Sequence, residues 1–258
     1  AWQIEFANTK LFLKKNNRKK KFLEFEKYCL QNLKDYINEK NLIVPEVIAY
    51  KNINNIEILL IEWIDMQNLD QKNLGKGLGE MQLNSSESSP KIFGYPIEGF
   101  IGLTDQKKGW ENNWIDCFLN LRIIPQLSIL KLNVLDKETK NKVKEKIKSE
   151  LLKHEPINTL VHGDLWSGNV GIERSGRGVI FDPASWWADN EVDIAMTKLF
   201  GGFRNEFYEE YHKIFPIKQG FEKRITIYNF YHILNHANMF GGQYFNQVRD
   251  YVRAILKM

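Results

Sequence analysis

The sequence predicts an α+β protein with two lobes, a small N-terminal lobe built on a β-sheet and a larger lobe that is mainly helical. Apolar and polar side chains alternate over residues 1–6, as in a strand with one buried face, and residues 10–14 are predicted to form a second strand after a turn at residues 8–9. Residues 56–64 form a largely apolar run of strand length. Helical periodicity dominates beyond this run. We therefore place a boundary after Ile64 and expect lobes at residues 1–64 and 65–258.

Composition limits the class of protein. Of the 258 residues, 43% are hydrophobic and 26% charged, which is typical of a globular protein with a sizeable core. No run approaches the roughly 20 apolar residues of a membrane span, so we expect no membrane partner. The first residues show no secretory pattern, and the two cysteines, Cys29 and Cys117, lie in helix-like apolar contexts. Buried thiols in a reducing compartment fit best, which predicts a cytoplasmic protein.

The charge is mild but clustered. The formal net charge is +4, and residues 14–21 read Lys-Lys-Asn-Asn-Arg-Lys-Lys-Lys. A nucleic-acid patch is one interpretation of this run. A solvated loop before a helix is favoured because no aromatic side chains are interleaved with the charges. We therefore expect no nucleic-acid partner.

A helix at residues 22–38 follows this loop. Glu26 falls inside its apolar stripe at about 100° per residue, whereas Glu24 falls on the opposite face. A glutamate on a buried face needs a partner, and Lys14 at the end of a strand is the candidate. The alternative is a border residue whose carboxylate reaches water. The stripe itself consists of Phe22, Phe25, Cys29 and Leu33.

The second lobe reads as a series of helices with one hairpin. Residues 85–90 are rich in serine and end in proline, which predicts a loop. Pro125 is expected to kink or break the helix that contains it. A turn at residues 175–178, Ser-Gly-Arg-Gly, predicts the hairpin. The predicted helices span residues 74–82, 114–130, 136–153, 191–200, 205–213 and 221–239.

The densest group of chemistry-bearing residues flanks this hairpin. Residues 161–170 read Val-His-Gly-Asp-Leu-Trp-Ser-Gly-Asn-Val, and residues 180–185 read Ile-Phe-Asp-Pro-Ala-Ser. The spacing from Asp164 to Asn169 equals that between the catalytic base and the Mg²⁺-binding Asn of protein kinases. Asp164 can accept a proton from an attacking hydroxyl. Asn169 and Asp182 offer oxygen ligands that suit a hard cation. Together these residues predict phosphoryl transfer to a hydroxyl.

The N-terminal lobe supports the same interpretation from distant segments. Kinase-like folds need a strand lysine that holds the nucleotide phosphates and a helix glutamate that positions it. Lys14 and Glu26 are suited to these roles. Glu62, Trp63 and Ile64 end the apolar strand where two lobes would meet, and their backbone groups could bind an adenine. This last assignment rests on position alone.

The chain resembles the fructosamine kinase (ketosamine-3-kinase) family, a branch of the aminoglycoside-phosphotransferase-like kinases with a protein-kinase-like fold. The resemblance spans nearly the whole chain. The motifs that carry it are His-Gly-Asp-Leu-Trp-Ser-Gly-Asn at 162–169, Asp-Pro-Ala-Ser at 182–185 and Phe-Gly-Gly-Phe at 200–203, with weaker matches at 12–14, 93–95, Trp110, Trp114 and 234–236. Many small-molecule kinases share the His-Gly-Asp of the first motif with Asn at this spacing. The combination of Leu-Trp-Ser-Gly-Asn with Asp-Pro-Ala-Ser is typical of a much narrower group of proteins.

The resemblance implies ATP-dependent phosphorylation of the 3-hydroxyl of a ketosamine, free or protein-bound, with Mg²⁺ as cofactor and deglycation as the outcome. It implies that Asp164 is the base, that Asn169 and Asp182 hold Mg²⁺, and that Lys14 and Glu26 position the phosphates. Trp166 would stack on the sugar, with a core tryptophan as the alternative. His236 would reach the substrate, with an internally satisfied helix histidine as the alternative.

Two departures accompany the resemblance. The family's phosphate-covering loop would precede Ala1, and Met81-Gln82 stands where relatives usually carry Leu-His. Two other functions stay open as well. One is a kinase of the same fold acting on an aminoglycoside, choline or another alcohol. The other is a non-catalytic module that binds nucleic acid through residues 14–21.

Overall fold

The computed structural model describes residues 1–6 and 9–258. The chain forms two compact units, each assembled from three segments. The first unit contains residues 1–88, 162–185 and 201–216, and the second contains the remaining segments. These units divide the chain differently from the predicted lobes at 1–64 and 65–258. The lobe boundary after Ile64 therefore stays a prediction.

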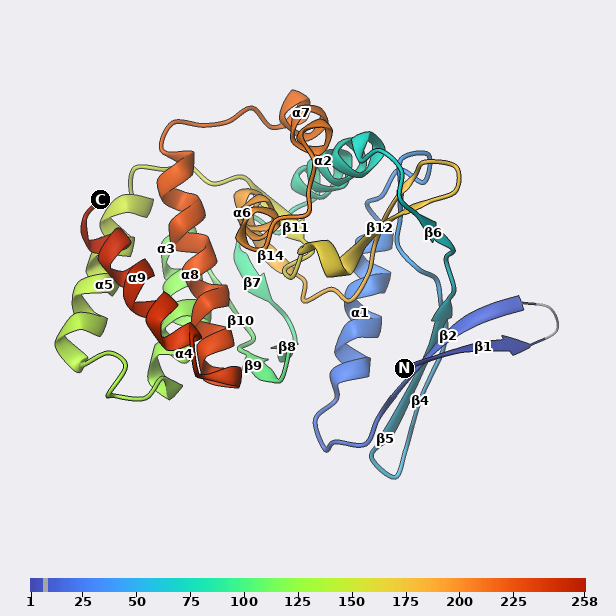
Figure 1. The fold of residues 1–258 in the computed structure, drawn as a ribbon, viewed down its shortest axis with the longest axis horizontal. Helices are drawn as coiled ribbons and strands as arrows, with labels where there is room; N and C mark the ends of the chain where they lie inside the picture. Colours follow the sequence, from blue (N-terminus) through green and yellow to red (C-terminus); the bar gives the residue numbers. More distant parts are fainter. Residues whose placement is uncertain (7–8) are drawn as a thin grey trace. The chain divides into compact units, whose positions relative to one another are not determined.

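A four-stranded antiparallel sheet opens the first unit, in the order β1-β2-β5-β4 (Figure 1). The strand predicted from the apolar run at 56–64 is present as β5, in which buried side chains alternate with partly or fully exposed ones. Helix α1 packs its apolar stripe against β4 and β5. The strand β4 was not predicted, and most of its side chains are exposed in the structure although it begins with an apolar run. The bounds are β1 Trp2–Phe6, β2 Thr9–Asn16, α1 Phe22–Lys34, β4 Val47–Ile53 and β5 Ile56–Glu62.

A second small sheet in this unit carries the predicted hairpin, in the order β3-β13-β12-β6. Strands β12 and β13 pair antiparallel around Gly176, as expected for the turn at 175–178. Helices α2 and α7 cross closely at Gly75, where a Cβ atom would meet the Phe207 carbonyl oxygen at 2.1 Å. The bounds are β3 Leu42–Ile43, β6 Met66–Gln67, α2 Lys72–Glu87, β12 Val170–Glu173, β13 Gly178–Ile180 and α7 Asn205–Ile214.

The second unit combines a sheet in the order β10-β7-β14-β11 and the hairpin β8-β9 with a group of helices. Helix α8 packs against α6 and α9, and α5 packs against α9. The strands are β7 Phe93–Tyr95, β8 Gly99–Ile101, β9 Thr104–Gln106, β10 Gly109–Glu111, β11 Asn158–Val161 and β14 Trp186–Asp189. The longer helices are α5 Lys137–Leu151, α6 Glu191–Leu199, α8 Phe221–Phe240 and α9 Tyr244–Leu256.

The predicted helix at 114–130 changes type along its length. It begins as α3, Trp114–Asp116, widens into a π-helical stretch, Cys117–Ile123, and ends as α4, Ile124–Ile129. Pro125 has no N–H to donate to the Leu121 carbonyl oxygen. That oxygen instead accepts a bond of 3.0 Å from the Arg122 guanidinium. In place of the expected kink, the helix has a π-helical stretch directly before Pro125.

Some predicted boundaries were wrong. Helix α2 continues through Glu87, although residues 85–90 predicted a loop. Ser85 and Ser86 bond back to carbonyl oxygens three residues earlier, at 2.9 and 2.7 Å, so these serines remain within the helix. Both cysteines are buried free thiols, as expected. Among the described residues, no helix is long and apolar enough to cross a membrane.

Candidate active site

The segment that carries Asp164 and Asn169 closes on itself. The Asn169 amide donates from Nδ2 to the Asp164 carbonyl oxygen at 2.8 Å and to its carboxylate at 3.3 Å. The five-residue spacing fits this closure because residues 167–169 form a short 3₁₀ turn. Gly163 has a φ of +84°, a left-handed conformation that glycine adopts without steric cost. The two residues predicted from spacing are thus in direct contact.

His162 joins the two halves of the motif, a role that the sequence interpretation missed. It is fully buried, and its Nε2 lies 2.9 Å from the Phe181 carbonyl oxygen. Its Nδ1 accepts from the backbone N–H of Asp164 at 3.3 Å. Burial lowers the pKa of His162 to about 4, so the ring is neutral and its Nε2–H donates. The only feature of the sequence that pointed to a role for His162 was its position directly before Gly163-Asp164.

Lys14, Glu26 and Asp182 form a second group. The Lys14 ammonium lies 2.6 Å from Glu26 Oε1 and also contacts Asp182. The contact predicted from the helical face of Glu26 is therefore present. Burial lowers the pKa of Lys14, but the two carboxylates outweigh it and the net shift is upward. Lys14 is accordingly an ammonium ion at neutral pH.

Glu26 responds to the same surroundings in the opposite sense. Its side chain is 12% exposed, and burial raises the pKa of its carboxyl to about 7 although Lys14 opposes the shift. A buried carboxylate is costly without a cation, so the ion pair holds Glu26 beside Lys14. The pair links strand β2 to helix α1.

Asp182 occupies an unusual backbone conformation. Its φ is +56°, in the left-handed region that non-glycine residues seldom adopt. Such a conformation persists only where neighbouring contacts hold it, and it is common at functional sites. The preceding Phe181 donates its N–H to the Asn169 carbonyl oxygen at 3.1 Å. This bond connects the Lys14 group to the Asp164 group.

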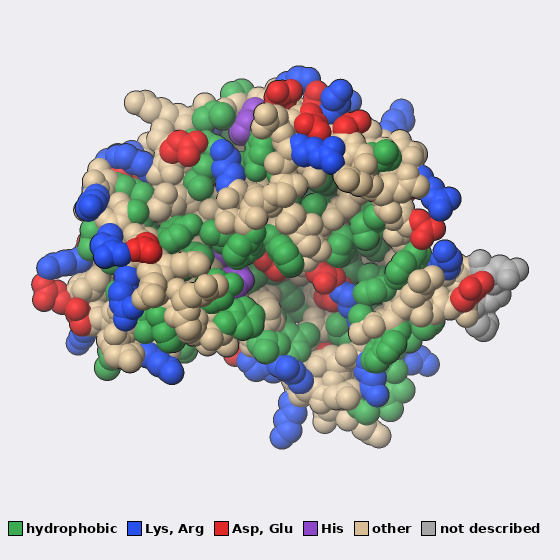
Figure 2. Space-filling view, viewed as in Figure 1, with side chains coloured by type: hydrophobic (Ala, Val, Ile, Leu, Met, Phe, Trp, Pro, Cys, Tyr) green, Lys and Arg blue, Asp and Glu red, His purple; other side chains and the backbone are tan. Residues whose placement is uncertain are grey.

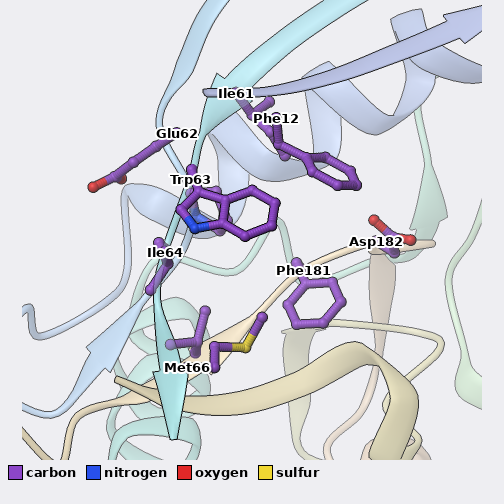
Figure 3. A pocket seen from close by; sticks show the side chains of 10 residues that line it. Phe12, Ile61, Glu62, Trp63, Ile64, Met66, Phe181 and Asp182 are labelled. Carbon is purple, nitrogen blue, oxygen red and sulfur yellow. The ribbon is translucent and has the colours of Figure 1, made fainter. Parts of the chain in front are cut away.

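A pocket of about 200 Å³ lies beside Asp182 (Figure 3). The side chains of Phe12, Trp63 and Phe181 surround it, and its walls are mainly apolar. The Trp63 indole donates to the Asp65 carboxylate at 2.8 Å, which fixes the ring against the pocket. Glu62, Trp63 and Ile64 all line this pocket, so the structure places them beside Asp182.

The two predicted substrate residues lie in different units. The Trp166 side chain is 39% exposed, so the core alternative is wrong. Its indole lies against Gly168, where a Cβ atom would meet the ring at 2.2 Å. His236 lies on α8 in the second unit, with its Nδ1 2.7 Å from the His232 carbonyl oxygen. Its ring is 5.1–5.7 Å from those of Phe200, Phe240 and Tyr244.

The departure at Met81-Gln82 has a structural counterpart. Gln82 is fully buried, and its Oε1 accepts from the Tyr211 hydroxyl at 2.6 Å. This bond joins α2 to α7 within the first unit. A buried amide thus finds its partner on the neighbouring helix.

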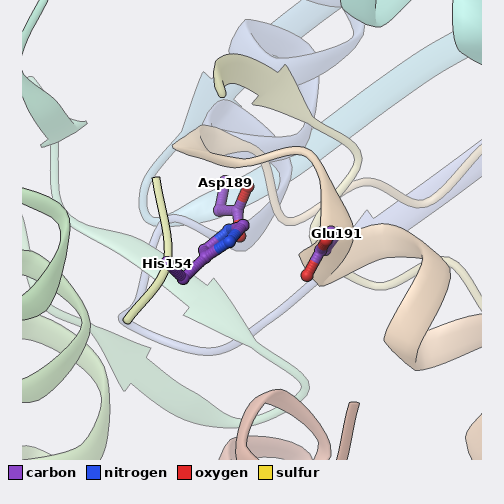
Figure 4. A group of neighbouring side chains, drawn as sticks. All are labelled: His154, Asp189 and Glu191. Carbon is purple, nitrogen blue, oxygen red and sulfur yellow. The ribbon is translucent and has the colours of Figure 1, made fainter. Parts of the chain in front are cut away.

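His154, Asp189 and Glu191 form an acidic cluster in the second unit (Figure 4). Both Glu191 oxygens accept from Arg224, at 2.5 and 2.8 Å. Asp189 accepts from the Tyr228 hydroxyl at 2.6 Å and lies 2.8 Å from His154 Nε2. Protein donors occupy these carboxylates, so we assign the cluster to the stability of the fold rather than to a metal.

Sequence comparison identifies relatives along the whole chain. The fructosamine kinase family model matches residues 1–258. A probable ketoamine kinase of Vibrio parahaemolyticus is 34% identical over 257 residues, covering 99% of this chain and 88% of the relative. The ketosamine-3-kinase of Mus musculus is 30% identical over 226 residues, covering 78% of this chain and 73% of the mouse protein.

Solved structures confirm the predicted protein-kinase-like α+β fold. A candidate fructosamine-3-kinase from Haemophilus somnus superposes with a TM-score of 0.85 at 24% identity, covering 99% of this chain and 86% of that one. A choline kinase from Streptococcus pneumoniae superposes with a TM-score of 0.63 at 15% identity, covering 99% and 89%. At these identities the likeness concerns the fold. The full-length family match and the 34% identity to a relative show that this chain belongs to the fructosamine kinase family.

Proposed function

We propose that the protein transfers the γ-phosphoryl group of ATP to a hydroxyl of a ketosamine, the product of a sugar and an amine. The observation that carries this proposal is the connection of two polar groups. Asp164 and Asn169 form one, Lys14 with Glu26 and Asp182 forms the other, and the Phe181–Asn169 backbone bond joins them. Family membership and the names of its relatives support the ketosamine as acceptor.

In this proposal Asp164 is the catalytic base. The acceptor hydroxyl attacks the γ-phosphorus, the bond from that phosphorus to the bridging oxygen of ADP breaks, and the hydroxyl proton passes to the Asp164 carboxylate. The Asn169 amide, bonded to Asp164 through Nδ2, holds that carboxylate in position.

The cofactor in this proposal is Mg²⁺, held by Asn169 and Asp182. The residues fit the ion because a side-chain amide oxygen and a carboxylate are the hard oxygen donors that Mg²⁺ prefers. The left-handed backbone at Asp182 supports the assignment, since held strain of this kind is typical of functional sites. When bound, the ion neutralises phosphate oxygens. Lys14, oriented by Glu26, adds a fixed positive charge for the same phosphates.

The nucleotide base would occupy the pocket beside Asp182. Its walls offer aromatic faces from Phe12, Trp63 and Phe181, on which a planar base can stack. The backbone of residues 62–64 passes along the pocket and can bond to the edge of an adenine. Glu62, Trp63 and Ile64 therefore keep their proposed role in nucleotide binding.

The acceptor side rests on Trp166 and His236. The partly exposed indole of Trp166, close in sequence to the proposed catalytic base Asp164, is suited to stacking on a sugar ring. His236 donates through Nδ1 to a backbone oxygen, so its Nε2 can accept a hydrogen bond from a donor group of a substrate. Both assignments stay proposals, as does whether the ketosamine is free or attached to a protein.

The decisive experiment measures phosphorylation of a panel of acceptors with Mg-ATP, together with product identification. Phosphate transfer to a fructosyl-amine is expected, and Asp164→Asn should lower kcat by about 10²–10⁴-fold, the usual contribution of a general base. The variant should keep its affinity for Mg-ATP. Wild-type turnover by Asp164→Asn would show that another group is the base.

The same panel separates the alternatives. Turnover of choline or an aminoglycoside without turnover of ketosamines would replace the proposed acceptor. A nucleic-acid module is disfavoured by the surface: on the face seen in Figure 2, Lys and Arg side chains are interspersed with Asp and Glu rather than joined in one basic track. Thermal stabilisation by RNA but not by Mg-ATP would favour that module.

A further inference from the structure

Helix α1, which carries Glu26, begins without a cap of its own. Lys21 occupies the N-cap position, and its side chain makes no capping bond. The first N–H groups of any helix lack partners within the helix and need acceptors from elsewhere. Because this helix end holds one half of the Lys14–Glu26 pair, the source of those acceptors bears on the site.

The acceptor is the carboxylate of Glu57, which lies on strand β5. Its Oε2 accepts from the Leu23 N–H at 3.2 Å and its Oε1 from the Glu24 N–H at 2.9 Å. Glu57 is only 1% exposed. A carboxylate at this end of a helix is also favoured by the helix dipole. A side chain 33–34 residues away in sequence thus caps α1.

The same carboxylate also bonds to the sheet. Asn16 donates from Nδ2 to Glu57 Oε2 at 2.6 Å, and the Tyr50 hydroxyl donates to Oε1 at 2.8 Å. Burial, together with the bond to Glu57, raises the pKa of Tyr50, so its hydroxyl stays protonated and donates. Four donors from β2, β4 and α1 therefore meet at one buried anion.

These bonds close a ring of contacts around the ion pair. Asn16 lies two residues after Lys14 on β2, so their side chains share a face of the strand. Glu24 lies two residues before Glu26 on α1. Lys14 and Glu26 are joined to each other at 2.6 Å. Glu57 completes the ring by holding Asn16 on one side and the N–H of Glu24 on the other.

We propose that Glu57 is a positioning residue for nucleotide binding, because it fixes the start of α1 against the sheet and thereby sets Glu26 against Lys14. The inference rests on the proposed function of the Lys14–Glu26 pair. Glu57 itself touches neither member of that pair, and it acts through the backbone of α1 and through Asn16. A cap supplied from within the helix would stabilise α1 but would not tie it to the sheet.

This difference gives the test. Glu57→Gln keeps the shape of the side chain but replaces one of the two acceptor oxygens by an NH₂ group, which cannot accept from the four donors. Its dissociation constant for Mg-ATP, measured by calorimetric titration, should rise about tenfold, together with a lower Tm. Lys21→Ser adds a local cap, since serine at this position with Glu24 three residues on forms a capping box. Lys21→Ser alone should leave Mg-ATP affinity within about twofold of wild type.

The double variant decides between positioning and stability. With Lys21→Ser added to Glu57→Gln, Tm should recover while the Mg-ATP dissociation constant stays raised. Recovery of both would overturn the proposal and make Glu57 a helix cap alone. In a Glu26→Gln background, Glu57→Gln should weaken Mg-ATP binding no further, because its effect passes through Glu26. A full additional loss would also overturn the proposal.

Two further arms keep the result decisive. If Glu57→Gln does not fold even with the local cap, Asn16→Ala carries the test because it keeps the cap and removes the tie to β2. Unchanged Mg-ATP affinity in Asn16→Ala would then overturn the proposal. Binding of Mg-ATP is measured without any acceptor. A wild type that binds Mg-ATP but phosphorylates no ketosamine would contradict the proposed function. The role of Glu57 would still be decided by the Mg-ATP dissociation constants of the variants.

Discussion

Each of the two compact units contains a group of oppositely charged side chains. The two groups differ in whether a charged side chain remains accessible to a ligand. In the second unit, Arg224 occupies both oxygens of Glu191. In the first unit, Lys14 is shared by Glu26 and Asp182, and the Asp182 side chain is 47% exposed on a left-handed backbone. The first arrangement satisfies its charges within the fold. The second leaves the Asp182 carboxylate half exposed beside the largely buried Lys14 ammonium, so a ligand can reach the carboxylate.

This contrast predicts that charge removal costs stability in one unit and ligand affinity in the other. The largest effect is expected for Arg224→Met, which leaves the Glu191 carboxylate buried and without its cation. Breaking a buried pair typically costs about 3–5 kcal/mol of unfolding free energy. Urea unfolding would measure the loss, and Mg-ATP affinity of the folded protein should not change.

The double variant Arg224→Met with Glu191→Leu is the matched control. Replacing both charges by apolar groups removes the buried, unpaired carboxylate, so most of the lost unfolding free energy should return. A double variant as unstable as Arg224→Met alone would show that the unpaired Glu191 carboxylate is not the source of the loss.

Lys14→Met tests the other side of the comparison. Without the ammonium, a bound phosphate loses its fixed positive charge, and the Mg-ATP dissociation constant should rise about 10–100-fold. Lys15→Met is the control, because Lys15 is the next residue on the same strand and is exposed. Calorimetric titration of both variants gives the comparison. Equal losses of affinity in the two would contradict a specific role for Lys14.

Buried histidines in both units predict a shared loss of stability in acid. Burial lowers the pKa of His162 to about 4 and of His232 to about 3. The unfolded chain binds these protons near pH 6.5, so the unfolding free energy is fully present above that pH and falls as the pH drops toward 4. Each histidine contributes a slope of at most about 1.4 kcal/mol per pH unit.

His232→Leu separates the two contributions. Neither ring nitrogen of His232 has a partner in the described part of the chain, so the substitution sacrifices no hydrogen bond. Urea unfolding at a series of pH values should show a shallower acid slope than wild type between pH 6 and about 4. Superimposable slopes would mean that His232 does not set the acid response.

The smallest effects are expected at two neighbouring glycines that lie beside the segment carrying Asp164 and Asn169. Gly202 has a φ of +91°, and a Cβ atom there would lie 2.5 Å from the Cβ of Ser167. Gly201 has a φ of +71° with nothing within 4 Å of such an atom. Gly201→Ala should cost only backbone strain, about 1–2 kcal/mol. Gly202→Ala should also lower kcat by displacing Ser167, and an unchanged kcat would contradict that coupling.

Local pattern was enough to predict much of the site. The spacing of Asp164 and Asn169 singled out two residues whose side chains the structure brings into contact, since a five-residue separation closes within one turn. The helical face of Glu26 predicted its partner Lys14, because the 3.6-residue period fixes which side chains face the sheet. Strand β5 was predicted from its apolar run and its length, and the hairpin of β12 and β13 from its turn residues. The roles of these residues in catalysis stay proposals.

The sequence by itself indicated the candidate site residues and the buried face of α1, since periodicity and turn chemistry act over a few residues. Only the tertiary structure decided which contacts hold the candidate site residues and helix α1 in place. His162 joins Asp164 to Phe181, and Glu57 joins α1 to the sheet. These contacts link segments far apart in the chain, and their partners are chosen by which polar groups become buried together. No local period encodes that choice.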